Sequence, residues 1–167
     1  MPKSEQGLLT NRYQVIPRTL VFIFNQDKVL LLKGAPTKRI WANLYNGIGG
    51  HIEAGEDILS SARRELLEEA GITARDMRLV GTLLVDVLPN QGIALFVLRG
   101  EYSGGELKDS SEGSLEWIEE NNIDDLPSPP DLKVILPIIT KMKKTSPPFS
   151  ARSFYDTHEK LRVVVAE

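Results

Sequence analysis

The sequence predicts an α+β fold, a sandwich built on a mixed β-sheet. Pairs of apolar stretches are joined by turn-forming residues, which is typical of β-hairpins. One central stretch has apolar residues at every third or fourth position, which indicates a helix. Strands are expected on both sides of this helix, as in layered α+β folds. The chain has 167 residues, the length of one compact domain, so we expect a single domain over residues 1–167.

The first predicted elements are two strands at residues 18–25 and 28–33. Both are rich in leucine and β-branched residues, and the turn-forming segment Asn25-Gln26-Asp27 separates them. Residues 34–44 have mixed charge and lead into the glycine-rich segment Gly47-Ile48-Gly49-Gly50. We therefore predict a β-hairpin followed by a loop.

The central helix is predicted to start at Ile58. Asp57 can cap its first turn, and Gly71 is a natural helix end. The apolar positions that give the helical spacing are Leu59, Ala62, Leu66 and Ala70. The helix therefore has one apolar stripe and one polar face.

The second half of the chain predicts three more strands, a helix and a closing hairpin. Residues 77–88 and 93–102 read as strands joined by the turn Pro89-Asn90-Gln91-Gly92, and residues 114–118 as a short strand. Residues 132–144 have helical apolar spacing, with Pro137 as a point of kinking or interruption. We expect a C-terminal hairpin at about residues 149–166.

Composition and charge exclude several classes of function. The net charge of −3 and the pI near 5.5 give no basic field, so we expect no nucleic acid polymer as a partner. The absence of cysteine excludes disulfides, thiolate metal sites and cysteine nucleophiles, and leaves oxygen ligands, His51 and His158 for a metal. Residues 1–10 lack the apolar segment of a signal peptide, and Leu20–Phe24 is too short to cross a bilayer. We expect a cytoplasmic protein with no membrane partner.

An acidic cluster on the central helix is the main chemical signal. Glu65, Glu68 and Glu69 are spaced so that their carboxylates can converge on one helical face. A solvated acidic face, balanced by Arg63 and Arg64, is the alternative. The glycine-rich loop before the helix favours a magnesium site, because Mg²⁺ prefers hard oxygen ligands and shares phosphate oxygens with its substrate.

Residues 50–72 resemble the signature of the Nudix hydrolases at every defined position. The segment GHIEAGEDILSSARRELLEEAGI fits the pattern G-x5-E-x7-R-E-U-x-E-E-x-G-U, where U is aliphatic. The resemblance implies the Nudix fold, an α/β/α sandwich with a central mixed sheet. It also implies metal-dependent hydrolysis of a nucleoside diphosphate linked to another group, with Mg²⁺ as the expected metal and Mn²⁺ as the alternative.

The resemblance also assigns roles within the signature. Glu68 and Glu69 resemble metal ligands, and Glu65 resembles either a further ligand or the group that handles the attacking water. Arg64 resembles the arginine that orients these glutamates, and Glu56 resembles the glutamate that supports them from the loop. The backbone carbonyl of Gly49, just before the signature, resembles a metal ligand. Gly50 has no side chain, so it permits phosphate to approach the backbone closely.

Four further candidates come from likeness to MutT-type enzymes. Asn46 is similar to a base-contacting asparagine, or else is a left-handed turn residue. Glu112 resembles an acidic-loop glutamate that completes the metal site or activates water. Asp131 resembles a residue on the purine edge, although it can equally be a helix cap. Lys33 is a candidate phosphate contact, and an aromatic residue such as Trp41 could stack on the base.

Three functions follow as hypotheses. The first is hydrolysis of a nucleoside triphosphate, such as the oxidised purine 8-oxo-dGTP, to monophosphate and pyrophosphate. The second is cleavage of ADP-ribose, a nucleotide sugar or a dinucleoside polyphosphate, for which Pro89 is a weak signal. The third is a non-catalytic nucleotide sensor, although sensors usually lose these glutamates. The oligomeric state stays open, with a homodimer among the alternatives.

Overall fold

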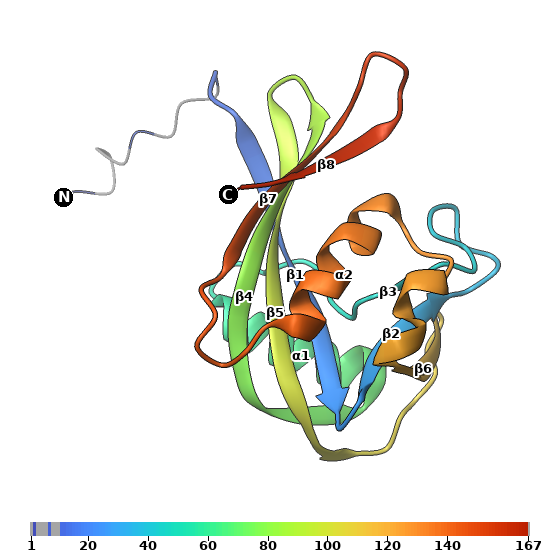
Figure 1. Cartoon of the computed structure of the whole chain (residues 1–167). Coiled ribbons are helices and arrows are strands. Elements are labelled where there is room, and N and C mark those ends of the chain that lie inside the picture. The colour runs from blue at the N-terminus through green and yellow to red at the C-terminus, as the bar shows by residue number, and fades with distance from the viewer. Residues whose placement is uncertain (1, 3–6, 8–10, 167) are drawn as a thin grey trace.

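The computed structural model describes residues 2, 7 and 11–166, and Figure 1 shows their arrangement. Most of the N-terminal segment that we judged to lack a signal peptide therefore lies outside the described residues. The strands are β1 (Gln14–Asn25), β2 (Lys28–Gly34), β3 (Tyr45–Asn46), β4 (Ile72–Leu88), β5 (Gln91–Gly105), β6 (Gly113–Glu119), β7 (Phe149–Tyr155) and β8 (Leu161–Val165). The helical elements are α1 (Ile58–Glu65), the π-helix η2 (Leu66–Ala70), the 3-10 helix η3 (Glu120–Asp125) and α2 (Pro130–Lys141).

The strands form one mixed sheet in the order β3-β2-β1-β5-β4-β7-β8, and β6 pairs with β2. The β1–β5 and β4–β7 pairs are parallel, whereas the hairpin pairs β1–β2, β4–β5 and β7–β8 are antiparallel. The predicted mixed sheet is confirmed. Its long β4–β5 and β7–β8 hairpins project beyond α2 at the top of Figure 1.

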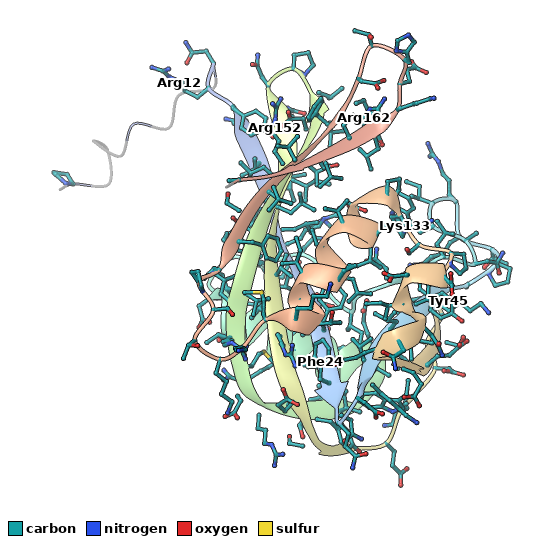
Figure 2. All side chains as sticks on the ribbon, in the orientation of Figure 1. Arg12, Phe24, Tyr45, Lys133, Arg152 and Arg162 are labelled. Carbon is teal, nitrogen blue, oxygen red and sulfur yellow. The ribbon has the colours of Figure 1, made fainter. Side chains whose placement is uncertain are left out.

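Helices cover the two faces of the sheet and bury two separate cores. Along β1, Leu20, Phe22 and Phe24 enter one core, and Val21 and Ile23 enter the other, because successive side chains of a strand point to opposite faces. Figure 2 shows Phe24 beneath α2. The helical residues of the two cores are Leu132, Ile135, Leu136 and Ile139 on the α2 side and Ala62, Leu66 and Ala70 on the α1 side. The predicted α+β arrangement, with helices on both faces of a mixed sheet, is therefore present.

Predicted caps fix the segment that carries the acidic cluster. The Asp57 carboxylate accepts hydrogen bonds from the backbone N–H groups of Leu59 and Ser60 at 2.8 and 2.9 Å, which satisfies free donors of the first turn. Gly71 ends the helical segment in the left-handed conformation, with φ of 69°. Between these caps the last turn is a π-helix, which the sequence pattern did not predict.

An arginine of the sheet fastens the end of α2. Arg99 donates to the backbone carbonyl groups of Ile139 and Thr140 at 2.8 and 3.2 Å, and its guanidinium stacks on the ring of Phe24. These contacts add hydrogen bonds to carbonyl groups in the last turn of the helix, where the Ile139 carbonyl also accepts from the Met142 N–H at 3.3 Å. The helix runs through Pro137 and ends at Lys141, before the predicted end at residue 144.

The hairpins were predicted well and the ends of long strands less well. β4 begins at Ile72 rather than residue 77, because residues 72–75 pair with the far end of β5. The two-residue strand β3 and the short helix η3 were not predicted. Within the described residues, no helix is long and apolar enough to span a membrane.

Candidate active site

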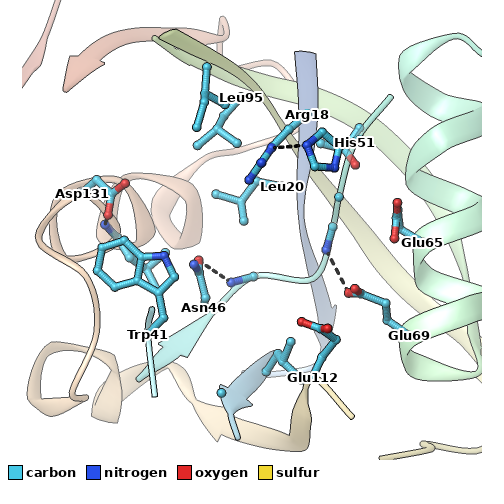
Figure 3. Close-up of a pocket in the computed structure, with 18 of the residues that line it drawn as sticks. Arg18, Leu20, Trp41, Asn46, His51, Glu65, Glu69, Leu95, Glu112 and Asp131 are labelled. Carbon is cyan, nitrogen blue, oxygen red and sulfur yellow. Dashed lines mark hydrogen bonds between the residues drawn. The ribbon is translucent and has the colours of Figure 1, made fainter. Parts of the chain in front are cut away.

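A cavity of about 560 Å³ opens beside the glycine-rich loop, within the size range of nucleotide-sized ligand pockets. Its wall combines β1, the segment between β3 and α1, the helical acidic cluster and the start of α2 (Figure 3). The lining residues that were predicted from the sequence are Asn46, Gly49, Gly50, Glu65, Glu69, Glu112 and Asp131. Segments that are far apart in the sequence therefore meet at one site.

Two glycines allow the loop to lie close to β1 and to the helix. At Gly49, φ is 149°, and a Cβ atom there would overlap the backbone carbonyl of Thr19. At Gly50, a Cβ atom would overlap the carboxylate of Glu65. Glycine is thus required at both positions for this backbone to pass between the strand and the acidic side chain.

Arg64 connects the loop to the acidic helix. Its Nε and Nη2 atoms donate to the two carboxylate oxygens of Glu56 at 2.7 and 3.0 Å. Its Nη1 donates to Glu65 at 2.8 Å and to Glu68 at 3.1 Å, and Nη2 also donates to the carbonyl of His51 at 3.0 Å. The hydrogen bond from Arg64 is the main reason that the pKa of Glu56 is lowered to about 2. This geometry fits the predicted orienting role of Arg64 and the supporting role of Glu56.

Glu65 and Glu69 face the cavity and lie close to each other. Glu65 is buried, with 8% of its surface exposed, and Glu69 is partly buried. Burial raises the pKa of Glu69 to about 7, and the negative charge of Glu65 contributes in the same direction. The backbone N–H of Gly49 lies 3.4 Å from the Glu69 carboxylate and offsets only part of this shift. Among the described residues, no lysine or arginine nitrogen lies within 4.0 Å of the Glu69 carboxylate, whereas Glu65 pairs with Arg64.

Glu68 behaves differently from its two neighbours. Its side chain is 58% exposed, bonds to Arg64 and does not line the cavity. Glu68 and Glu65 both accept from Nη1 of Arg64, but of these two side chains Glu65 alone lines the cavity. In the described part of the chain, no three histidine or acidic side chains are grouped closely enough to hold a metal ion as they stand. The three-glutamate convergence expected from α-helical spacing is not formed.

The residues nevertheless fit a divalent cation. The groups on this side of the cavity are hard oxygen donors, the carboxylates of Glu65, Glu69 and Glu112. The raised pKa of Glu69 reports a negative charge that burial and neighbouring carboxylates destabilise, and a cation would stabilise it. Glu65, Glu69 and Glu112 are the residues that would hold the ion, with Gly49 and Glu68 as the further predicted ligands.

Glu112 and Lys38 line the cavity, whereas the predicted phosphate contact Lys33 lies outside it. Glu112 lies in the turn before β6, lines the cavity and forms an ion pair with Lys38 of the loop after β2. Lys33 does not line the cavity, which corrects its predicted place at the substrate site. Because side chains alternate along β2, Leu32 and Gly34 line the cavity, and Lys33 lies beside Tyr45 and Glu116.

The opposite side of the cavity offers an aromatic ring and two hydrogen-bonding side chains. Asn46 lies in β3 without a positive φ, so the left-handed turn alternative is wrong; its side-chain oxygen accepts from the Gly47 N–H at 2.9 Å. Asp131 follows Pro130 in the first turn of α2, where Pro129 is the cap, so it is not the N-cap. Burial raises the pKa of Asp131. Figure 3 shows both residues beside Trp41.

Arg18 and His51 also line the cavity, and neither was predicted to bind substrate. Arg18 Nε donates to His51 Nε2 at 3.1 Å, and an isolated bridge joins their backbones across 33 residues of sequence. Arg18 and Leu20 lie two residues apart on β1, so they share the face of the strand that lines the cavity. This spacing gave no indication that His51 is the partner of Arg18.

Comparison with known proteins decides the family. The model of the NUDIX domain family matches residues 15–138, which include the whole acidic helix, the glycine-rich loop and most of α2. The chain belongs to the Nudix family. Nudix hydrolases act on small nucleotide substrates and generally use divalent metal ions.

Named relatives of this Nudix protein are hydrolases. The oxidized purine nucleoside triphosphate hydrolase of Danio rerio is 32% identical over 106 residues, covering 63% of this chain and 67% of the relative. Its counterpart in Mus musculus is 28% identical over 127 residues, covering 75% and 80%. The crystal structure of a mutator MutT protein from Bacillus halodurans superposes with a TM-score of 0.73 at 26% identity, over 90% of this chain and 97% of that chain. The chain is therefore a MutT-like Nudix pyrophosphohydrolase.

Proposed function

We propose that this Nudix enzyme hydrolyses an oxidised purine nucleoside triphosphate, such as 8-oxo-dGTP, to the monophosphate and pyrophosphate with Mg²⁺. The observation that carries the proposal is the division of one cavity into two chemically different sides. Glu65, Glu69 and Glu112 lie on one side, and Trp41 and the polar pair Asn46 and Asp131 lie on the other (Figure 3). A metal-bound phosphate chain and a purine base are the two halves of a nucleotide that suit these sides.

The chain's own residues support hydrolysis at phosphorus. Gly49 and Gly50 bring backbone close to the position of the phosphates, with no side chain in the way. When bound, a divalent cation neutralises charge on phosphate oxygens and lowers the pKa of a coordinated water. The Glu65 carboxylate, held by Arg64 at 2.8 Å, is placed to accept the proton of the attacking water. Water oxygen then bonds to phosphorus, the phosphoanhydride bond breaks, and pyrophosphate leaves.

The base side provides the support for a purine. Asn46 uses its carbonyl oxygen on Gly47, which orients its amide N–H donors. Because burial raises the pKa of Asp131, its protonated form is more accessible, and a protonated carboxyl can donate as well as accept. Trp41 offers a face for stacking on the base. The named animal relatives act on oxidised purine triphosphates, which supports this choice of substrate.

A substrate panel tests the proposal. Purified enzyme with Mg²⁺ is incubated with 8-oxo-dGTP, dGTP, ADP-ribose, a nucleotide sugar and a dinucleoside polyphosphate, and the products are separated by ion-exchange chromatography. We expect the highest kcat/KM for 8-oxo-dGTP, with pyrophosphate as a product. Cleavage of ADP-ribose with both triphosphates untouched would contradict the proposal. Binding of nucleotide without turnover of any member would favour a sensor. Repeating the panel with Mn²⁺ identifies the preferred metal.

A further inference from the structure

Arg18 and His51 form a basic pair at the border of the cavity. Arg18 precedes the buried part of β1, and His51 directly follows Gly50. Figure 3 shows the pair with Glu65 and Glu69 on one side and Trp41, Asn46 and Asp131 on the other. The pair thus lines the same cavity as the acidic side and the aromatic side.

The charge of Arg18 is not balanced by a neighbouring carboxylate. Among the residues that the structure describes, no carboxylate oxygen lies within 4.0 Å of its guanidinium, whereas Arg64 pairs with Glu56, Glu65 and Glu68. An arginine keeps its charge at all ordinary pH values, and its planar fork suits phosphate oxygens. Within the described residues, the Nε–H is the one side-chain donor of Arg18 that has a partner, the His51 ring, so the terminal NH₂ groups remain to donate to an anion.

His51 fixes the direction of this guanidinium. Its Nε2 accepts from Arg18, so in the neutral ring the proton is on Nδ1. The backbone carbonyl of His51 accepts from Arg64 Nη2 at 3.0 Å, which ties the histidine to the arginine that orients the catalytic glutamates. The two arginines are thus linked through one residue. Arg64 is directed to the protein's own carboxylates, and Arg18 is directed to the cavity.

We propose that Arg18, positioned by His51, binds the phosphate chain of the substrate. This inference rests on the proposed function, since it requires a ligand whose phosphates lie at the glycine-rich loop. The cavity is otherwise strongly acidic on that side, and the other nearby cation, Lys38, is paired with Glu112. Arg18 therefore offsets the repulsion between the substrate's phosphates and the carboxylates of the site.

Steady-state kinetics of Arg18→Gln with 8-oxo-dGTP test the proposal. Loss of a charge-assisted hydrogen bond is expected to raise KM about 10-fold or more, while kcat changes less than about threefold. Arg18→Lys keeps the charge but loses the fork, so its KM should lie between the two. The inhibition constant of the unphosphorylated nucleoside, 8-oxodeoxyguanosine, should be unchanged. Arg75→Gln, which removes one exposed arginine outside the cavity lining, is the matched control and should behave as wild type.

A double-mutant cycle tests the positioning role of His51. His51→Ala removes the ring but leaves the backbone carbonyl that Arg64 uses, so it should raise KM by a smaller factor than Arg18→Gln. If His51 acts through Arg18, the double variant will have the same KM as Arg18→Gln alone. Multiplicative effects of the two substitutions would contradict the positioning role.

The outcomes separate this inference from the proposed function. Wild-type enzyme that does not cleave the triphosphate would contradict the proposed function. Wild-type enzyme that cleaves it, with an unchanged KM in Arg18→Gln, would overturn the role of Arg18 alone. Equal weakening of the triphosphate and of the unphosphorylated nucleoside would also overturn it, because the arginine would then act on the base or on the shape of the cavity. Circular dichroism of each variant checks that the fold is retained.

Discussion

Two surface cavities formed by the described residues have similar volumes, about 560 Å³ beside the acidic helix and about 590 Å³ at the projecting hairpins. They differ in how their charges are balanced. In the second cavity, Asp86 accepts from the hydroxyl of Tyr13 and from Nε of Arg152, both at 2.8 Å. Figure 2 shows Arg152 at the base of the β7–β8 hairpin. In the first cavity, Glu69 and Arg18 are left without opposite charges of this kind.

This comparison teaches that volume does not identify the functional site, whereas unbalanced charge does. A matched ion pair has little left to offer a ligand, and a buried carboxylate with a raised pKa is stabilised when a cation arrives. Pro89, which was a weak sequence signal for ADP-ribose cleavage, lines the second cavity and not the first. Its position gives no support to that alternative.

The largest expected effect is at the unbalanced glutamate. Glu69→Gln should lower kcat at least about 100-fold, because it removes an anionic ligand from the metal site. The melting temperature should stay level or rise, since the variant also removes repulsion with Glu65. Turnover assays and thermal denaturation measure the two effects, and Glu106→Gln, an exposed glutamate outside the cavity, serves as the control. If Glu69→Gln kept the turnover of wild type, the assignment of Glu69 as a metal ligand would be wrong.

Glu68 sharpens the comparison because it lies outside the cavity as the structure stands. The Nudix signature assigns it as a metal ligand, so Glu68→Gln should also lower kcat by about 100-fold or more. Turnover measured across a range of Mg²⁺ concentrations should show weaker metal binding, so the variant should need a higher Mg²⁺ concentration than wild type for half-maximal turnover. If Glu68→Gln keeps full activity while Glu69→Gln loses it, Glu68 only balances the charge of Arg64.

Arg64→Lys is expected to have the next largest effect. Lysine keeps the positive charge but cannot make the paired contacts with Glu56 at 2.7 and 3.0 Å while also holding Glu65. We expect kcat/KM to fall about 10- to 100-fold, as is typical when a residue that orients metal ligands is replaced. Arg63→Lys, on the same helix and exposed, is the control. Equal kinetics for the two variants would show that the fork of Arg64 has no orienting role.

A smaller and selective effect is expected at Asp131. The asparagine of Asp131→Asn does not ionise, so it cannot gain or lose a proton as the carboxyl group can. The preference for 8-oxo-dGTP over dGTP, measured as a ratio of kcat/KM values, should therefore fall about 10-fold. Asp124→Asn in the exposed part of η3 is the control. A loss of activity that is equal for both nucleotides would indicate a structural role for Asp131 and not a role in base selection.

The smallest effect is expected in the second cavity. Asp86→Asn should leave kcat/KM unchanged and reduce the free energy of unfolding by about 1 kcal/mol, since the pair with Arg152 is partly exposed. Burial alone would raise the pKa of Asp86, but the bonds from Tyr13 and Arg152 outweigh it and lower the pKa below 3.8. A lowered pKa stabilises the fold above pH 3.8, and this contribution is lost as the pH falls further. Urea denaturation should therefore show the difference between wild type and variant shrinking below about pH 4. A change in kcat/KM would show that the second cavity also affects catalysis, against the difference drawn between the two cavities.

Features set by nearby residues were predicted from the sequence. The turn Asn25-Gln26-Asp27, the cap Asp57 and the left-handed Gly71 each use contacts or conformations within a few residues, and all are found in the structure. The acidic cluster was located correctly for the same reason. The roles of its members as metal ligands stay predictions.

Features set by distant pairing were not predicted. The first residues of β4, from Ile72 to Arg75, form a strand by pairing with the end of β5, about 30 residues away along the sequence. The Arg18–His51 contact depends on a bridge between β1 and the residue after the glycine-rich loop. The π-helical turn that carries Glu68 was not predicted either, because no apolar pattern distinguishes this turn from an α-helix. Lys33 was misplaced because its neighbours on β2, and not its charge, decide which side chains reach the cavity.

The parallel pairing of β1 with β5 has a consequence for the order in which the molecule is made. Gln14 pairs with Gln91, a separation of 77 residues, so the strand that carries Arg18 is synthesised long before its neighbour in the sheet. The β1–β2 hairpin can form early, but the nucleotide pocket also needs the first turn of α2, which supplies Asp131. Closing such long loops slows folding. A growing chain on the ribosome therefore cannot capture nucleotide until nearly the whole of this region has emerged.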